Sequence, residues 1–438
     1  MNKKIVTILI VATLLLSSCA QGNIKKGNSN DKHTITIAVT EGNIGQFNAW
    51  EARSKEFTKE TGIKVRFVGV PYENLLNRIT TEGISEEPSF DLVTYADVMG
   101  PSIKQFLQPL DGYTDKKFFD RFPESTMKLS TYDNKIYSLP LRANTQLLFY
   151  RKDIFKKLNI EPPKTWEDLN KASAKIKKET GKYGITPYYQ SGNNGQNLYM
   201  WTSYLWGNDG DIFDKNMKPI FNNKKGVEAT KEYIDLIRKD RAPKGSVQFG
   251  EQDSRTHFKQ GRSAMWLGWW WVYSDFNGAD SAKEVQNNVG FVPVPTWKGG
   301  DKVSSISTFP LGMMKDSKNK KDAWKFMKWL SEEENEKSIV KDSLTKKSPP
   351  EQFSTDIVQK KNLRDKELND LGDNLFNIAG DSFEEADTLP TSRIWPRVSD
   401  ILSREISNMA TGDDVEKSLD KAADDVEKLL DSEGYYDK

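Results

Sequence analysis

The chain has 438 residues. A single hydrophobic core rarely supports a chain of this length, so two or three domains are expected. Its 64 lysines and arginines balance 63 aspartates and glutamates, which argues against a nucleic-acid partner, because such proteins need a basic surface. One cysteine and two histidines exclude an internal disulfide and nearly exclude zinc or thiolate chemistry, so we expect no metal or other cofactor.

The first 19 residues have the pattern of a targeting segment. Two lysines precede an apolar run at 5–16, which is too short for a comfortable membrane span. The sequence LSSC that follows resembles the lipobox of bacterial lipoproteins, which implies a signal peptide at 1–18 and a diacylglycerol on Cys19. Two acyl chains anchor a protein stably. The alternative is a plain signal peptide with an incidental cysteine.

Residues 19–33 are polar and rich in Gly, Asn and Lys, which predicts a flexible tether. The protein is therefore expected outside the cytoplasm, anchored to the outer face of the cell membrane. The many lysines and asparagines suggest an AT-rich genome and a Gram-positive cell.

From residue 34 onward, strands alternate with helices. This alternation predicts βαβ units, a parallel sheet and ligand sites at the carboxyl ends of the strands. The expected strands are 34–40, 63–70 and 90–98, and the expected helices are 47–62, 72–83 and 101–110.

A long extended, apolar segment at 135–153 is suited to connecting two lobes. A second α/β block follows, in which Thr165 is the expected N-cap of a helix. Apolar residues at helical spacing predict a final helix from Val415 to Leu430. Further strands are expected at 183–190, 263–267, 289–297 and 308–316, and further helices at 198–207, 227–240 and 319–334.

Two motifs in this block carry a family resemblance. One is YRKDIFKKLNIEPPKTWEDL at 150–169, and the other is an F-x-x-G-x-x-A-M pattern from Phe258 to Met265. These two motifs and the segments DLVTYADV, TFPLGMMKD and LPTSRIWPRVSDIL occur in the order expected of one family. By this ordered set, the chain resembles the family 1 extracellular solute-binding proteins, the sugar-capturing components of ABC importers.

The resemblance implies a two-lobe α/β fold of the periplasmic-binding-protein type II, each lobe a sheet flanked by helices, with a hinge that the chain crosses three times. Lobe one would comprise 34–143 and 308–350, and lobe two 147–303 and 355–438. The implied partners are a carbohydrate, bound by hinge closure, and the membrane permease subunits of an importer. We expect a monomer.

A sugar site needs flat aromatic rings against the sugar faces and planar polar side chains for the hydroxyls. The stretch MWLGWWWVYSDF at 265–276 holds four of the chain's twelve tryptophans. Because consecutive residues cannot all face one way, we expect one or two of Trp269, Trp270 and Trp271 in the cleft and the others packed in lobe two, and favour Trp269 and Trp270. The alternative is that all four belong to the core.

The resemblance also places a sugar-binding carboxylate at Asp97, with Tyr95 as its aromatic neighbour; a helix N-cap at Asp97 is the alternative. Glu41 follows the first strand and is either a hydroxyl acceptor or a solvated loop residue. The remaining candidates lie near the expected crossings, on the 198–207 helix or in the segment SRIWP: Asn144, Trp201, Phe309, Arg393 and Trp395.

We expect no enzymatic activity, because the chain has no G-x-S-x-G, Walker or H-E-x-x-H motif. One alternative is a secreted glycoside hydrolase or lyase that uses two carboxylates, which the sequence cannot locate. Another is a receptor of the same fold for a solute other than sugar.

Overall fold

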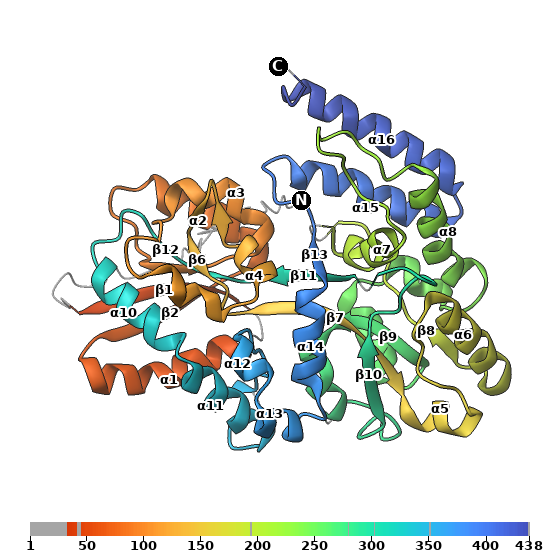
Figure 1. Ribbon diagram of the computed structural model, residues 1–438, viewed down its shortest axis with the longest axis horizontal. Coiled ribbons are helices and arrows are strands. Elements are labelled where there is room, and N and C mark those ends of the chain that lie inside the picture. Colours follow the sequence, from red (N-terminus) through yellow and green to blue (C-terminus); the bar gives the residue numbers. More distant parts are fainter. Residues whose placement is uncertain are drawn as a thin grey trace, which may run out of the picture. The chain divides into compact units, whose positions relative to one another are not determined.

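The computed structural model describes residues 33–41, 45–192, 195–278, 280–301, 303–349 and 352–436. The signal peptide, Cys19 and nearly all of the tether lie outside these described residues. Residues 33–438 form one compact unit, built on two β-sheets with helices against them (Figure 1). We refer to each sheet with its helices as lobe one and lobe two.

The lobe-one sheet has five strands in the order β2-β1-β3-β12-β6. Its three N-terminal strands run parallel, while β12 is antiparallel to both of its neighbours. The β-branched sequence TITIAVT forms β1, as such residues favour strands. The strand bounds are β1 Thr34–Thr40, β2 Lys64–Val70, β3 Leu92–Thr94, β6 Ser138–Leu139 and β12 Leu311–Met313.

Helices cover both faces of this sheet. Ile37 of β1 packs in a cluster with Phe57 of α1 and Phe326 of α10. The next residue, Ala38, faces the opposite side, in a cluster with residues of α2 and α3. The helices and short 3-10 helices are α1 Gly45–Thr61, α2 Tyr72–Ile84, η1 Asp97–Met99, α3 Gly100–Ile103, η2 Lys104–Phe106, η3 Lys116–Arg121, α10 Lys320–Leu330 and α11 Glu333–Leu344.

The lobe-two sheet follows the order β13-β11-β7-β9-β8, and β10 pairs with the second half of β7. β7 is the long central strand and lies antiparallel to β9, β10 and β11. The strand bounds are β7 Ala143–Arg151, β8 Tyr183–Ile185, β9 Ser263–Trp269, β10 Val289–Pro293, β11 Ser304–Thr308 and β13 Ala386–Thr388, while a separate hairpin joins β4 Thr131–Tyr132 to β5 Lys135–Ile136.

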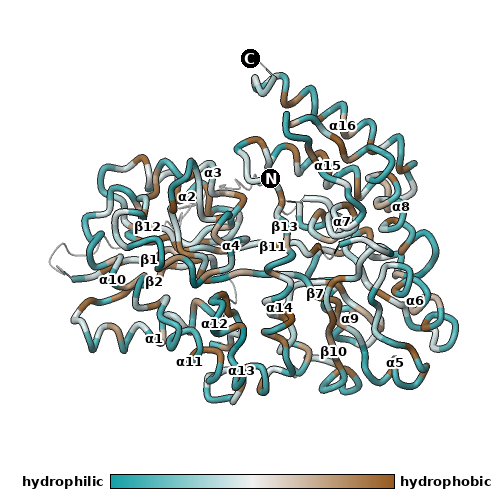
Figure 2. The backbone as a smooth tube through the Cα atoms, viewed as in Figure 1, coloured by the Kyte–Doolittle hydropathy of each residue, from teal (hydrophilic) through white to brown (hydrophobic). Residues whose placement is uncertain are grey.

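The helices of lobe two follow the sequence signals closely. Thr165 caps α6: its hydroxyl accepts a hydrogen bond from the Asp168 N–H at 3.1 Å, and the Asp168 carboxylate accepts one from the Thr165 N–H. Figure 2 shows hydrophobic and hydrophilic residues alternating along α15 and α16. The bounds are α5 Lys152–Leu158, α6 Trp166–Thr180, α7 Gln196–Gly207, α8 Lys224–Arg238, α9 Glu251–Lys259, α15 Trp395–Thr411 and α16 Val415–Ser432.

The chain passes between the two sheets at three places. It leaves the lobe-one sheet after Leu139 and enters β7 at Ala143. It returns to the lobe-one sheet between Thr308 of β11 and Leu311 of β12. It crosses to the lobe-two sheet a second time between α11 and β13. The elements near these passages are α4 Glu124–Lys128, α12 Lys360–Leu363, α13 Lys366–Leu371 and α14 Leu375–Glu384. Lobe two also contains the 3-10 helices η5 Lys244–Gln248 and η6 Trp270–Asn277.

One apolar cluster runs from lobe one under the lobe-two sheet. It contains Ile37 of β1, Leu147 of β7 and Phe376 of α14. The opposite face of the lobe-two sheet packs against α6, α7, α8, α15 and α16 in a second cluster. Among the described helices, none combines the length and the apolar composition that a membrane crossing requires.

Candidate functional site

A cavity of about 530 Å³ opens between the two lobes. Tyr72 of α2, Val98 of η1 and Ser102 of α3 line it from lobe one, while Gln196 of α7 and Trp395 of α15 line it from lobe two. This volume lies within the usual range of small-molecule sites. A larger cavity of about 700 Å³ beside the β4–β5 hairpin is lined by residues of neither α7 nor α15, so it does not join the lobes.

Trp395 is the largest apolar side chain at this cavity. It is the first residue of α15, and Pro396 in the first turn suits the helix start, where a proline loses no hydrogen bond. The indole is only 1% exposed, yet its Nε1 has no hydrogen-bond partner. A buried N–H without an acceptor costs free energy, so this donor is available to a ligand that reaches the cavity.

Polar side chains lie beside the cavity on the same face of the lobe-two sheet. Asn144 and Gln146 lie two residues apart on β7 and therefore share a face. Asn144 pairs in register with Ser307 of β11, and Gln146 with Trp269 of β9. Both amide side chains are buried, and Asn144 Oδ1 and Gln146 Nε2 lack partners. We call the polar residues Asn144, Gln146 and Ser307, together with Asp97 and Tyr199, the cleft floor.

Asp97 connects lobe one to this floor. Its carboxylate accepts hydrogen bonds from the Val98 N–H at 2.8 Å and from the Thr308 N–H of β11 at 2.9 Å. The Ser307 side chain lies next to Asp97 and Tyr199 and opposes the rise of both pKa values. Burial raises the pKa of Asp97 to about 7, although the two backbone hydrogen bonds oppose that shift.

Aromatic rings from both lobes surround the floor. The Tyr199 ring meets the Trp269 ring edge-on, with centroids 5.0 Å apart. Tyr72 lies 6.3 Å from Phe309, between centroids. Val98 packs against the apolar clusters of both lobes. Rings beside amide, hydroxyl and carboxylate groups can hold a polyhydroxylated ligand, whose C–H faces lie on the rings while its hydroxyls find polar partners.

Behind the floor, all three passages between the lobes meet at Arg142. Its carbonyl accepts a hydrogen bond from the Phe309 N–H at 2.9 Å, on the second passage. Its guanidinium lies 3.7 Å from the carboxylate of Asp356, on the third, close enough for an ion pair but too far for a hydrogen bond. Burial raises the pKa of Asp356, and the Arg142 charge opposes this shift.

Two of the tryptophans expected at the cleft lie in the core. Trp270 has 0% exposure, and its Nε1 donates to the Ala143 carbonyl at 3.0 Å while its ring packs against Phe376. Trp201 is also fully buried, and its Nε1 donates to Thr230 Oγ1 at 2.8 Å. A ring without exposed surface cannot contact a ligand unless it moves, so the structure does not bring Trp201 and Trp270 to the site.

Three other candidates also lie away from the cavity surface. Tyr95 is buried in the lobe-one core, where its hydroxyl donates to Ser138 Oγ at 2.8 Å. Glu41 is exposed at the end of β1, and Arg393 is exposed ahead of α15. Of the candidates, Trp395 lines the cavity. Asp97, Asn144 and Trp269 belong to or contact the cleft floor, and Phe309 lies near the cavity-lining Tyr72. The binding role of all five stays a prediction.

Sequence reasoning missed several residues of the site. Tyr72 begins α2 directly after β2, a place where parallel sheets collect ligand-binding residues, so this position was a usable signal. Tyr199, Gln146 and Ser307 gave no such signal, because their grouping depends on strand pairing. Within the described residues, no group of three or more His, Cys, Asp or Glu side chains is arranged to hold a metal ion.

Comparisons with known proteins agree with this architecture. The arabinooligosaccharide-binding protein of Bacillus subtilis (strain 168) is 26% identical over 418 residues, which cover 91% of this chain and 92% of that protein. The maltodextrin-binding protein MdxE of the same organism is 26% identical over 320 residues, or 70% of each chain.

Among solved structures, maltose-bound T. maritima MalE3 matches with a TM-score of 0.77 and 22% identity, over 91% of this chain and 100% of that one. This likeness establishes the fold as the two-lobe binding-protein type. Residues 41–337 match the family described as bacterial extracellular solute-binding protein. The chain belongs to the family of bacterial extracellular solute-binding proteins.

Proposed function

We propose that this protein is a lipid-anchored receptor that captures a carbohydrate outside the cytoplasm and delivers it to the permease of an ABC importer. The observation that carries the proposal is the cavity between the lobes, with Tyr72 on one side, Trp395 on the other, and a polar floor beside it. The family consists of binding proteins, so the enzyme alternative has no support.

An oligosaccharide is the cargo that the observations favour. The names of the two Bacillus relatives refer to arabinooligosaccharides and maltodextrin. The unpartnered Asn144 Oδ1, Gln146 Nε2 and Trp395 Nε1 supply one acceptor and two donors, a mixture that suits hydroxyl groups, which both donate and accept. A phosphorylated cargo would instead require several cations facing the cavity, and Asp400 is the only charged residue among its lining.

Capture would proceed by hinge closure. A sugar that touches Tyr72 and Trp395 together contacts both lobes, and it therefore binds the closed form better than the open form. In this mechanism Trp269, Phe309 and Trp395 contact sugar rings, while Asp97 and Asn144 bind hydroxyls. Tyr72 and Tyr199 join this set on the strength of their positions.

The lipid anchor at Cys19 rests on the sequence alone, because that residue lies outside the described residues. Two acyl chains on Cys19 and the polar stretch after it would hold the binding unit at the outer face of the membrane of a Gram-positive cell. The receptor would act as a monomer and dock on the permease when closed.

The test is isothermal titration calorimetry with maltotetraose and arabinotriose on the wild type, Trp395→Ala and Tyr72→Ala. Each variant should bind at least about ten-fold more weakly, the factor that corresponds to 1.4 kcal/mol. Trp324→Ala is the matched control, since Trp324 lies on α10 and packs against Tyr113.

The proposal fails if neither sugar binds the wild type, or if both cleft variants keep wild-type affinity. Release of shortened saccharides during the titration would instead support the enzyme alternative. Palmitate labelling of cells that carry the wild type or Cys19→Ser tests the anchor separately, and equal labelling would contradict it.

A further inference from the structure

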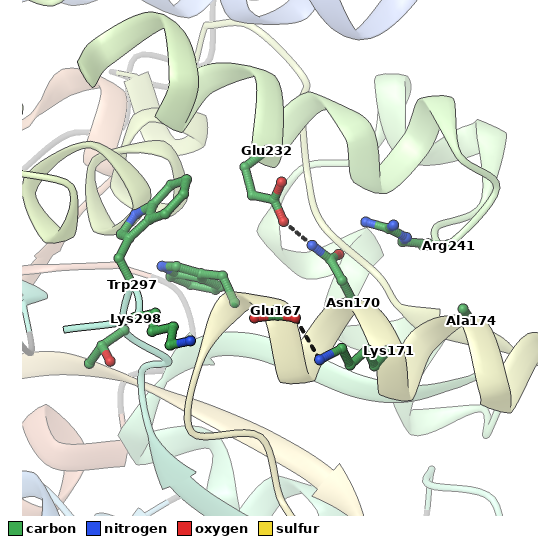
Figure 3. A pocket seen from close by; sticks show the side chains of 10 residues that line it. Glu167, Asn170, Lys171, Ala174, Glu232, Arg241, Trp297 and Lys298 are labelled. Atoms are coloured by element: carbon green, nitrogen blue, oxygen red, sulfur yellow. Dashed lines mark hydrogen bonds and ion pairs between the residues drawn. The ribbon is translucent and has the colours of Figure 1, made fainter. Parts of the chain in front are cut away.

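A second cavity, of about 460 Å³, lies in lobe two away from the cleft. One face of α6 lines it with Asn170 and Lys171, α8 adds Glu232, and the segment after β10 adds Trp297 (Figure 3). None of its lining residues lines the cavity between the lobes. We call this cavity the α6–α8 pocket.

Two indoles line the pocket. Trp297 is half-buried, and its orientation is fixed because Nε1 donates to the Tyr204 carbonyl at 2.9 Å. Trp166 stacks on the Tyr204 ring, with centroids 3.6 Å apart and an interplanar angle of 18°. Rigid aromatic side chains of this kind bind ligand surface at a small cost in conformational entropy.

The polar side of the pocket comes from two helices. Asn170 of α6 points toward Glu232 of α8, and its Nδ2 donates to that carboxylate (Figure 3). Burial raises the pKa of Glu232, and the neighbouring Arg241 opposes this shift. Glu167 and Lys171 pair with each other at the rim, so the charges in the pocket largely compensate one another.

Several buried polar atoms at this pocket have no hydrogen-bond partner. They are Nε1 of Trp166, Oδ1 of Asn170 and Nη1 of Arg241, all on residues that line the pocket. Oη of Tyr204, which lies in the electrostatic field of Glu232 and Arg241, also has none. Trp166 and Tyr204 are each 1% exposed. An unpaired buried polar group costs about 1–3 kcal/mol, so these groups favour a ligand or bound water that pairs with them.

We propose that the α6–α8 pocket is a second carbohydrate site, which binds one neutral sugar ring against Trp297. The unpartnered atoms include both donors and an acceptor, a combination that hydroxyl groups can satisfy and that a purely anionic or cationic ligand cannot. The four atoms are shielded from solvent in this form, so a sugar reaches them only after side chains at the pocket rim shift.

This site works independently of the cleft. All its lining residues come from lobe two, so binding there does not require the lobes to close. A sugar ring bound there would therefore be held whether the lobes are open or closed. The inference does not rest on the function proposed for the cleft.

The experiment uses the chain in a Cys19→Ser background, with 5-fluorotryptophan in place of tryptophan, followed by ¹⁹F NMR. Trp297→Phe and Trp395→Phe assign one resonance in each site. Glucose, galactose and arabinose are titrated to millimolar concentrations. The Trp297 resonance should shift saturably with at least one of them, and this shift should persist in Trp395→Ala. Asn170→Ala should weaken it about ten-fold, the factor that 1.4 kcal/mol confers.

Lys178→Ala is the matched control on the exposed face of α6 and should leave the titration unchanged. A Trp297 resonance that none of the three sugars shifts overturns the second site, because water alone then occupies the pocket. A shift that Asn170→Ala does not weaken also overturns it. If Trp297 responds while maltotetraose and arabinotriose, added in a separate titration, leave the Trp395 resonance unshifted, the cleft proposal fails and this one stands.

Discussion

At the scale of single residues, Asp97 has an unusual position for a carboxylate. It is 1% exposed and faces no cation that pairs with it in the described structure, yet it accepts two backbone hydrogen bonds. One donor, Val98, belongs to its own 3-10 helix, and the other, Thr308, belongs to the lobe-two strand β11. The N-cap alternative does not hold, because Ala96 is the N-cap residue of this 3-10 helix, and Asp97 instead forms a bridge between the lobes.

This burial makes the stability depend on pH. The pKa of Asp97 is about 7 in the folded chain, against an ordinary value of 3.8. Between these values the folded state holds a proton that the unfolded state has lost, so this carboxyl's stabilising contribution decreases as pH rises toward 7. In Asp97→Asn this dependence is removed. The Tm of the variant minus the Tm of the wild type should therefore increase between about pH 5 and about pH 8.

Glu336 is an internal control for this measurement. Burial raises its pKa to about 7 as well, but it is present in both proteins, so its effect cancels in the difference. A Tm difference between variant and wild type that stays constant across this pH range contradicts the assignment to Asp97.

At the scale of elements, β9 and η6 explain how the crowded tryptophans divide. Along β9, Trp266 packs on one face of the sheet with Phe149, whereas Leu267 and Trp269 face the other. Gly268 allows this, because a Cβ there would lie 2.1 Å from the Trp266 ring. The chain then turns into η6, which returns Trp270 to the buried side and leaves Trp271 half-buried.

This division predicts different effects for neighbouring substitutions. Trp270→Ala removes a fully buried indole and its hydrogen bond, so it should lower the free energy of unfolding by about 3–5 kcal/mol. Trp271→Ala, the adjacent control, should cost clearly less because that ring is partly exposed. Urea denaturation of both variants measures the difference, and equal losses would contradict the core position of Trp270.

Local patterns predicted about half of the helices and strands, but not their extents. The helices at α1, α2, α6, α7, α8, α10 and α16 lie where apolar spacing and caps placed them. The expected helix at 101–110 instead breaks after Ile103, because Leu107 bridges to Met314 and Gln108 donates to the Met313 carbonyl. The expected strand at 308–316 divides at Pro310, since Thr308 belongs to one sheet and Leu311 to the other.

The same limit applies to the candidate site. Trp395 and Asp97 followed from family position, but the choice between Trp269 and Trp270 depended on where a strand becomes a 3-10 helix. Tertiary pairing, which no local pattern encodes, also brings Ser307 opposite Asn144. Pairing across distant segments is therefore the information that the sequence reasoning lacked.

At the scale of the whole molecule, the passages between the lobes form a compact hinge. Arg142 lies beside the rings of Phe309 and Trp271, with its guanidinium carbon 5.0 and 5.7 Å from their centroids. With Asp356 nearby, it connects three segments that are far apart in the sequence. Because the chain crosses in three short segments that meet at Arg142, we expect the lobes to rotate as rigid bodies rather than bend within either sheet.

Such rotation predicts a change in the distance between the lobes when sugar binds. Donor and acceptor dyes at Gln105→Cys on η2 and Arg404→Cys on α15, in a Cys19→Ser background, report this distance by single-molecule energy transfer; both positions are exposed. Because a ligand that contacts both lobes stabilises the closed form, maltotetraose or arabinotriose should raise the transfer efficiency in proportion to saturation.

The matched control carries dyes at Gln105→Cys and Lys55→Cys, both exposed and both in lobe one. Its efficiency should not change, since the lobe moves as one body. If sugar binds stoichiometrically and the interlobe efficiency stays constant, capture does not involve closure, and the cavity in its present form is already the bound form. A change in both pairs would instead locate the motion within lobe one, which a rotation about Arg142 cannot produce.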